Sequence, residues 1–344
     1  MGDTYYPPFH RSEDKKNLME HPVKLRNLGK SGLMITPIGL GCWQFSKQGN
    51  LAGKFWPSLP DETIREIVRV SLDGGINWFD TAEVYGQGAS EKALAKALAS
   101  LGKKPGEILV ATKWWPLFRR ASNMSKTIGD RLACLMPYPI GLYQVHQPWG
   151  FSSEVSEMKA MAELVRSKKI SHVGVSNFSA KKMRSAWETL QREGINLVSN
   201  QVQYSLLHRN IESDGTLETA KELGITIIAF SPLAQGLVTG KFHDNPELLK
   251  NIGFRRYSSR FKPEGMEKSR PVAALVKELA GKYQVTPSQV ALNWLVNFHG
   301  ETVVAIPGAT KASHATENTG AMKFILSNED MQLLDKASSG FTGS

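Results

Sequence analysis

The stretch DETIREIVRVSLDGGINWFD (61–80) contains a complete helix pattern followed by a complete strand pattern. Apolar residues recur at helical spacing over 61–75, with Asp61 as a suitable N-cap and Gly74-Gly75 as the stop. The run INWFD (76–80) is short and apolar, as expected for a buried strand. A helix that leads directly into such a strand is typical of α/β proteins with a parallel sheet and helical crossovers.

The same alternation continues on both sides of this stretch. Seven more apolar runs predict strands at 38–43, 107–113, 141–147, 171–177, 197–203, 225–231 and 302–308. A second helix is predicted over 90–102, with Ser90 as its cap. Eight such units without a linker predict an α/β fold, a (β/α)8 TIM barrel, as a single domain over 24–344, after a polar extension over 1–23.

Further segments add to this barrel. KLRNLGKSGLMITPIGL (24–40) predicts a β-hairpin turned at GKSG, which would plug the amino-terminal end of the barrel. A long loop over 234–270 follows the seventh strand, and extra helices are predicted at 287–298 and 328–338. The alternative, a doubly wound sheet, needs a glycine-rich turn after its first strand, and GLGCW (39–43) lacks the third glycine.

Composition excludes several classes of protein. The net charge is +10, but the basic residues are spread along the chain without a nucleic-acid-binding motif. Their concentration over 241–270 suits one small anion, such as a cofactor phosphate. Cys42 and Cys134 lack the spacing of a disulfide framework or a zinc site, and no metal site is predicted. Without a long apolar run or a signal-peptide core, we expect a cytoplasmic protein that does not insert into membranes.

Polar residues stand at the ends of three consecutive predicted strands. Asp80 ends the second strand and Tyr85 lies in its loop, while Lys113 ends the third and His146 the fourth. Each residue also has an ordinary structural explanation. Asp80 could cap a helix or turn, Tyr85 could pack against its neighbours, Lys113 could be solvated, and His146 could be a hydrogen-bonded core histidine. In a barrel the carboxyl ends of the strands meet on one rim, where chemistry is located. The shared placement therefore favours a catalytic group of four.

These four residue types suit proton transfer to the oxygen of a carbonyl group whose carbon receives a hydride. A free tyrosine is a poor acid, with a pKa of about 10. An ammonium about 4 Å away would attract its phenolate by roughly 4 kcal/mol, or about three pKa units before desolvation. Lys113 is therefore expected to lower the pKa of Tyr85, and Asp80 to hold Lys113 in place and charged. Neutral His146 would orient the carbonyl by a hydrogen bond.

Seven motifs now identify a resemblance. They are GINWFDTAEVYG (75–86), ILVATK (108–113), YQVHQP (143–148), VGVSNF (173–178), NQVQYSLL (200–207), SPLAQGLVTGKF (231–242) and IPGATKASHATEN (306–318). In this order, over about 24–340, the chain resembles the aldo-keto reductase superfamily, in the branch of bacterial general reductases and potassium-channel β subunits. The resemblance implies NADPH-dependent reduction of aldehydes and ketones to alcohols, with Tyr85 as the general acid.

The resemblance also implies a cofactor site across the barrel mouth. The nicotinamide carboxamide would be held by Ser176, Asn177 and Gln201, and the ring of Phe230 would stack on the nicotinamide. The pyrophosphate would be lined by Ser231, Leu233, Gly236 and Lys241. Trp43 would border the cofactor, and Glu317 and Asn318 would meet the adenine. Many relatives have arginine where His314 stands, and some have lysine at the place of Gly308. Lys311, Lys241 or the basic loop would then contact the 2′-phosphate, and NADPH is expected rather than NADH.

Four tryptophans, Trp43, Trp114, Trp115 and Trp149, follow strand ends on the same rim. They predict a substrate pocket for a flat or apolar carbonyl compound. Two other functions suit the same residues. One is an NADPH-binding regulatory subunit that senses redox state and turns over slowly. The other is an aldolase that forms a Schiff base on Lys113, which is disfavoured because Asp80 would keep that lysine protonated.

Overall fold

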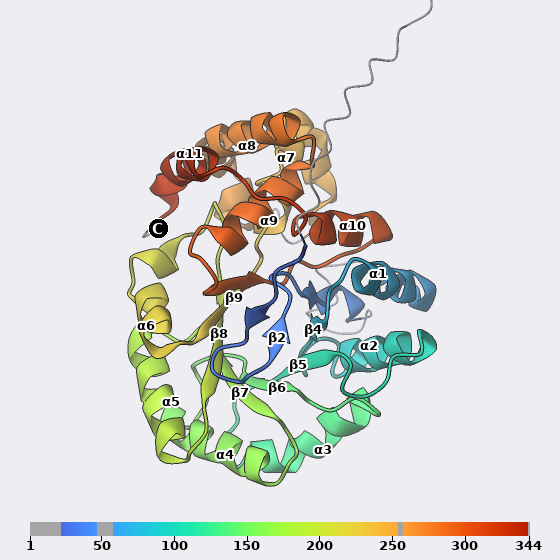
Figure 1. Cartoon of the computed structure of the whole chain (residues 1–344), viewed down its shortest axis with the longest axis vertical. Helices are drawn as coiled ribbons and strands as arrows, with labels where there is room; N and C mark the ends of the chain where they lie inside the picture. Colours follow the sequence, from blue (N-terminus) through green and yellow to red (C-terminus); the bar gives the residue numbers. More distant parts are fainter. Residues whose placement is uncertain (1–21, 47–57, 254–256, 343–344) are drawn as a thin grey trace, which may run out of the picture.

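The structure, a computed structural model, describes residues 22–46, 58–253 and 257–342; residues 1–21 of the predicted extension lie outside it. Eight parallel strands form one sheet in chain order (Figure 1). They are β3 (Leu40–Gly41), β4 (Trp78–Asp80), β5 (Leu109–Trp114), β6 (Leu142–Val145), β7 (His172–Ser176), β8 (Leu197–Gln203), β9 (Thr226–Phe230) and β10 (Val303–Ala305). Bridges from Ile38 to Ala305 and from Gly41 to Gly308 join the first strand to the last. The predicted (β/α)8 fold and its eight strands are confirmed; β8 has the predicted bounds, and the other strands are shorter than expected.

Helices surround this sheet (Figure 1). They are α1 (Asp61–Asp73), α2 (Ala89–Ser100), α3 (Asn123–Leu135), α4 (Glu154–Arg166), α5 (Ala180–Arg192), α6 (Thr216–Leu223), α8 (Pro263–Tyr283), α9 (Pro287–Asn297), α10 (Ala312–Gly320) and α11 (Asn328–Ser338). The predicted helices over 61–75, 90–102, 287–298 and 328–338 are confirmed. None of the helices that the structure describes is long and apolar enough to cross a membrane.

Two predicted helix caps are wrong. Pro60 is the N-cap of α1, and Asp61 is the first helical residue, where its charge still suits the positive end of the helix dipole. Gly88, with a φ of 91°, is the N-cap of α2. Ser90 is instead buried, and its hydroxyl donates to Cys42 O at 2.7 Å. The C-cap predicted at Gly74 is confirmed.

The predicted hairpin is present at the amino-terminal end of the strands. Its strands β1 (Arg26–Asn27) and β2 (Met34–Ile35) are antiparallel. Leu28 and Ile35 are buried in the same apolar cluster as the inward-facing Trp78. Gly29 turns the hairpin with a φ of 50°, and a Cβ there would lie 2.4 Å from Val198 O. The hairpin therefore closes one end of the barrel and leaves the other for the site.

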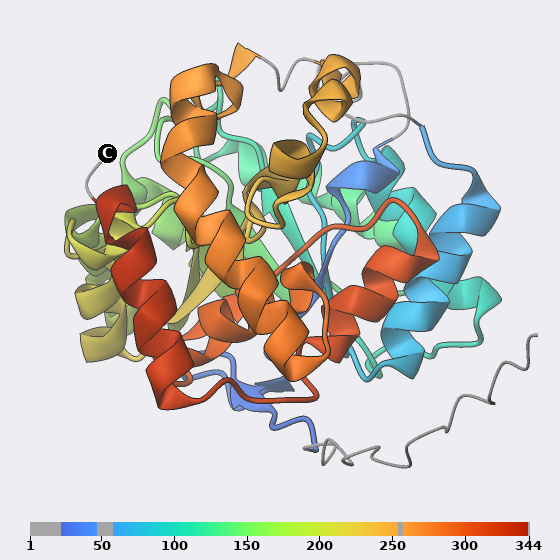
Figure 2. The same cartoon turned by 90° about the horizontal axis from the view of Figure 1, so that it is seen from above.

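The segment after β9 lies at the opposite end (Figure 2, gold and orange). It contains the short helices η4 (Ala234–Gly236), α7 (Lys241–Asp244), η5 (Pro246–Asn251) and η7 (Ser259–Phe261), and residues 254–256 lie outside the described part. The loop predicted over 234–270 is too long, because α8 begins at Pro263. The charged residues at the start of α8 obscure the helical spacing of Met266, Val272 and Val276, which are buried.

Candidate active site

The structure brings the four predicted catalytic side chains together. Asp80 ends β4 and Lys113 lies near the end of β5, while His146 follows β6 and Tyr85 lies between β4 and α2. Asp80, Tyr85 and His146 line a pocket of about 1220 Å³ at the carboxyl ends of the strands. Lys113, with an exposed fraction of 0%, lies beneath them.

Lys113 is the centre of this group. Its ammonium donates to Asp80 Oδ1 and, at 2.9 Å, to Thr81 O. It lies 5.1 Å from the centre of the Tyr85 ring. His146 meets the same ring edge-on, with 5.8 Å between centroids and an angle of 82°. A buried ion pair therefore contacts the tyrosine, and the tyrosine contacts the histidine.

The pKa values follow from burial and from this ion pair. Burial raises the pKa of Tyr85 by more than Lys113 lowers it, so the net pKa is raised although the effect of Lys113 has the expected sign. Burial also works to lower the pKa of Lys113, but Asp80 and Tyr85 outweigh it, and that pKa is raised. Burial and then Lys113 hold the pKa of His146 well below 6.5. At neutral pH the site holds a protonated tyrosine, an ammonium and a neutral imidazole.

Two amides complete the surroundings of Asp80. Its Oδ2 accepts from Gln201 Nε2 at 2.9 Å and from Gln144 Nε2 at 3.1 Å. Gln201 was expected at the cofactor, whereas Gln144 was missed. The signal for Gln144 was its place two residues before His146 in the strand predicted over 141–147, because alternate residues of a strand face the same side.

The pocket continues from this group toward α10. All the predicted cofactor residues except Lys311 line it: Trp43, Ser176, Asn177, Gln201, Phe230, Ser231, Leu233, Gly236, Lys241, Gly308, His314, Glu317 and Asn318. Lys311 is the exposed residue before α10. Sequence reasoning missed other lining residues, among them Gln44, Gln203, Gln235, Arg260, Ser288 and Thr310. Gln235 and Arg260 belong to the long segment after β9 and Gln44 to the turn after β3, whereas Gln203 ends β8, Ser288 lies in α9 and Thr310 precedes α10.

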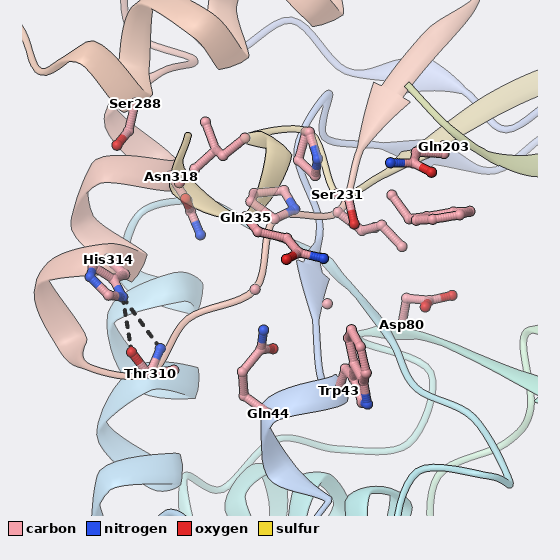
Figure 3. Close-up of a pocket in the computed structure, with 18 of the residues that line it drawn as sticks. Trp43, Gln44, Asp80, Gln203, Ser231, Gln235, Ser288, Thr310, His314 and Asn318 are labelled. Atoms are coloured by element: carbon pink, nitrogen blue, oxygen red, sulfur yellow. Dashed lines mark hydrogen bonds between the residues drawn. The ribbon is translucent and has the colours of Figure 1, made fainter. Parts of the chain in front are cut away.

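The pocket presents polar atoms that suit an elongated polar ligand. The amides of Gln44, Gln235 and Asn318 point into it (Figure 3). Among the described residues, Gln44 Oε1, Gln235 Oε1, Asn318 Nδ2 and His146 Nδ1 are buried without a hydrogen-bond partner. A buried polar group without a partner costs about 1–3 kcal/mol. The pocket wall therefore carries amides at intervals, together with lysine and arginine side chains. These groups match the donors and acceptors of a nicotinamide dinucleotide.

Of the four predicted tryptophans, two line the pocket, one lies outside it and one is buried in the core. Trp43 and Trp115 line the pocket; Trp43 stacks on Tyr85 at 6.2 Å, and Trp115 stands edge-on to His146 at 5.1 Å. Trp149, 49% exposed, packs against Trp115 outside the pocket lining.

The rim position expected for Trp114 is wrong. It is fully buried in the core, and its indole N–H donates to Asn123 Oδ1 at 3.2 Å. Successive residues of a strand face opposite sides, so Lys113 faces inward and Trp114 faces the helices. Within the described ranges, no group of three or more His, Cys, Asp or Glu side chains is placed to hold a metal ion.

Known proteins are similar to this chain in fold and in sequence. The model of the Aldo/keto reductase family matches residues 37–339. An uncharacterized oxidoreductase of Mycobacterium tuberculosis is 34% identical over 309 residues, which cover 89% of this chain and 90% of that protein.

Two solved structures agree with this match. A glycerol dehydrogenase from Gluconobacter oxydans has a TM-score of 0.79 at 27% identity, covering 93% of this chain and 96% of its own. An aldo/keto reductase from Klebsiella pneumoniae, solved in complex with NADP and acetate, has a TM-score of 0.69 at 26% identity, covering 91% and 95%. The chain belongs to the aldo/keto reductase family of oxidoreductases.

Proposed function

We propose that this protein reduces aldehydes and ketones to alcohols with NADPH, and that Tyr85 is the general acid. The observation that carries the proposal is the position of Tyr85 on the pocket wall, with its ring centre 5.1 Å from the buried Lys113 ammonium and its edge beside His146. NADPH, when bound, supplies the hydride that the carbonyl carbon accepts.

Each of the four residues then has its own role in the reaction at the carbonyl oxygen. Tyr85 holds its proton in the free site, because burial raises its pKa. As negative charge develops on the carbonyl oxygen, the hydroxyl of Tyr85 gives up that proton, and Lys113 stabilises the phenolate that remains. The neutral imidazole of His146 carries one N–H, which orients the carbonyl by a hydrogen bond. Asp80 keeps Lys113 charged and fixed.

The cofactor would be held along the whole pocket. Gln201 uses its amide N–H on Asp80, which leaves its carbonyl oxygen for the nicotinamide carboxamide. Ser176 and Asn177 would contact the same carboxamide, and Phe230 would stack on the ring. The pyrophosphate would follow Ser231, Leu233 and Gly236 toward the adenine at Glu317 and Asn318, and Lys241 is assigned below to the 2′-phosphate instead of the pyrophosphate. The presence of NADP in the Klebsiella pneumoniae relative supports this choice of cofactor.

The contact to the 2′-phosphate is assigned to Lys241. Burial, then the charges of Lys311 and Lys241, lower the pKa of His314, so its imidazole is neutral at pH 7. His314 Nδ1 is an acceptor for Thr310 N at 3.4 Å, which puts the N–H on the other ring nitrogen. A neutral imidazole contributes one hydrogen bond but no charge. Lys241 lines the pocket, and its charge contributes to lowering the pKa of His314. It therefore supplies a cation at the adenine end.

Arg260 is a further cation on the pocket wall. Burial lowers the pKa of Arg260, yet its guanidinium remains charged at neutral pH. It lies beside Gln203 at the end of β8, where the amide oxygen of Gln203 accepts from both terminal guanidinium nitrogens at 3.2 Å. We assign Arg260 to the phosphates of the cofactor rather than to the carbonyl compound.

The test is oxidation of NADPH and of NADH by the purified protein with a panel of aldehydes, ketones and sugars. The proposal predicts turnover at about 1 s⁻¹ or faster with at least one carbonyl compound, and preference for NADPH. Tight NADPH binding with turnover far below that rate for the whole panel would favour a redox-sensing regulatory subunit. Trapping of a substrate on Lys113 by borohydride would favour the aldolase, against which the ammonium's contacts with Asp80 already argue.

A further inference from the structure

An ion pair that takes no part in the proposed chemistry lies beside the site. Glu83 belongs to the loop between β4 and α2, and Arg119 to the loop between β5 and α3. Glu83 Oε1 accepts from Arg119 Nη1 at 2.5 Å, and its Oε2 accepts from the backbone N–H of Trp115 at 3.1 Å. The side chains of Glu83 and Arg119 are 12% and 32% exposed, so water screens this pair only in part. We call these two side chains the clasp.

The clasp connects the loop of Tyr85 to the indole ring of Trp115, which lines the pocket. Glu83 stands two residues before Tyr85, and its own N–H donates to Lys113 O at 3.2 Å. The carboxylate of Glu83 then fixes the backbone of Trp115. The Trp115 indole stands edge-on to His146, at 5.1 Å and 81°, and borders the pocket. One carboxylate therefore sets the position of an aromatic wall relative to the proton donor.

Arg119 extends this connection to a third loop. Its carbonyl oxygen accepts from Phe151 N at 2.9 Å, in the loop between β6 and α4. In the same loop Gly150 packs on Pro116, where a Cβ on the glycine would lie 3.2 Å from the proline Cβ. Trp149, the residue before Gly150, packs edge-on against Trp115 at 5.5 Å. Without the clasp, the Trp115 loop would lose its two contacts with Glu83 and would keep only its contacts with the third loop.

We propose that the clasp is a positioning device that selects substrates: Glu83 and Arg119 hold Trp115 against His146, and so favour aromatic carbonyl compounds that pack on the indole. This proposal rests on the proposed carbonyl reduction. Edge-to-face and stacked aromatic pairs have a preferred geometry, and displacement of Trp115 removes it. A small aliphatic aldehyde reaches Tyr85 and His146 without needing the indole. The clasp therefore acts on the Michaelis constant of aromatic substrates and leaves the chemical step unchanged.

The kinetic test uses the NADPH holoenzyme with an aromatic aldehyde, para-nitrobenzaldehyde, and with a small aliphatic one, propanal. Glu83→Gln and Arg119→Gln break the ion pair, whereas Glu83→Ala also removes the acceptor for Trp115 N. We expect the Michaelis constant for the aromatic aldehyde to rise by about 2- to 10-fold, most in Glu83→Ala, because that range corresponds to the loss of one aromatic contact. The kcat values and the Michaelis constant for propanal should stay within about 2-fold of the wild type, since the chemical groups are intact.

Two further variants separate positioning from a general effect on folding. Arg119→Lys keeps a cation for Glu83 and should restore part of the affinity for the aromatic aldehyde. Arg184→Gln breaks an exposed ion pair with Glu222 on the outer helices, and should leave every constant unchanged. Equal rises in the Michaelis constants for both aldehydes, or a fall in kcat alone, would overturn the assignment of substrate selection to the clasp.

A second readout does not depend on turnover. In protein labelled with 5-fluorotryptophan, the ¹⁹F resonance of Trp115 is identified by its loss in Trp115→Phe. We expect Glu83→Ala to shift or broaden this resonance and Arg184→Gln to leave it unchanged. An unchanged resonance in Glu83→Ala, in an active protein, overturns the clasp alone. A wild type that reduces no carbonyl compound removes the proposed function, and the selection with it, whatever the resonance does.

Discussion

Replacing Lys113 with methionine would leave the buried carboxylate of Asp80 without its ammonium partner. Asp80 is 1% exposed, so water does not replace the lost charge. Removing one member of a buried ion pair typically costs about 3–5 kcal/mol. The amides of Gln144 and Gln201 still donate to Asp80 Oδ2 and offset part of this cost. We therefore expect Lys113→Met to lower the free energy of unfolding by about 3 kcal/mol at pH 7.

The double variant Asp80→Asn/Lys113→Met is the matched control. It removes both charges, so no buried charge is left unpaired, and its stability should lie within about 1 kcal/mol of the wild type. Both variants should lose reductase activity, which separates the role of the pair in stability from its role in the reaction.

The assay is urea unfolding followed by tryptophan fluorescence and by far-ultraviolet circular dichroism. Coincidence of the two transitions is required before a free energy is taken from them. Wild-type stability supplied by Lys113 should be present below the pKa of an unfolded lysine, about 10.4, and lost as pH rises through the raised folded value. A single variant as stable as the wild type, or a double variant as unstable as the single one, would refute the reasoning.

Two further predictions concern charges elsewhere in the chain. Burial raises the pKa of Glu157 to about 8, and its Oε1 lacks a partner among the described residues. Its folded pKa exceeds the unfolded one, so the stability it contributes is lost as pH rises from about 4 to about 8. Glu157→Gln should raise the free energy of unfolding at pH 7 by up to about 3 kcal/mol, measured against exposed Glu163→Gln; an identical pH dependence in both would contradict this. Lys241→Met should weaken NADPH by about 10-fold and NADH far less in fluorescence titrations, with Lys311→Met as the comparison; equal losses for both cofactors would rule out a 2′-phosphate contact.

The barrel and the four convergent residues were predictable because they depend on local patterns. Each apolar run marks a strand, and the polar residue after it marks the rim, as for Asp80 and His146. Trp114 was misplaced because a whole tryptophan set was assigned to the rim without following the alternation along β5. The caps of α1 and α2 were misplaced by one or two residues, since Pro60 and Gly88 take positions that Asp61 and Ser90 also suit.

Other features of the site depend on contacts between distant segments. Gln144 and Gln201 meet Asp80 only when β4, β6 and β8 curl around the same interior. Arg260 reaches the pocket through the long segment after β9, whose path no local pattern describes. The pKa of Tyr85 was expected to fall because its burial was not known, and burial decides the sign.

The most direct test of the account is the rate of aldehyde reduction by Tyr85→Phe. This variant keeps the ring that stacks on Trp43 and removes only the hydroxyl. We expect kcat to fall by at least about 100-fold, because a general acid is lost, while NADPH binds with nearly unchanged affinity. Retention of wild-type turnover in Tyr85→Phe would contradict the central claim.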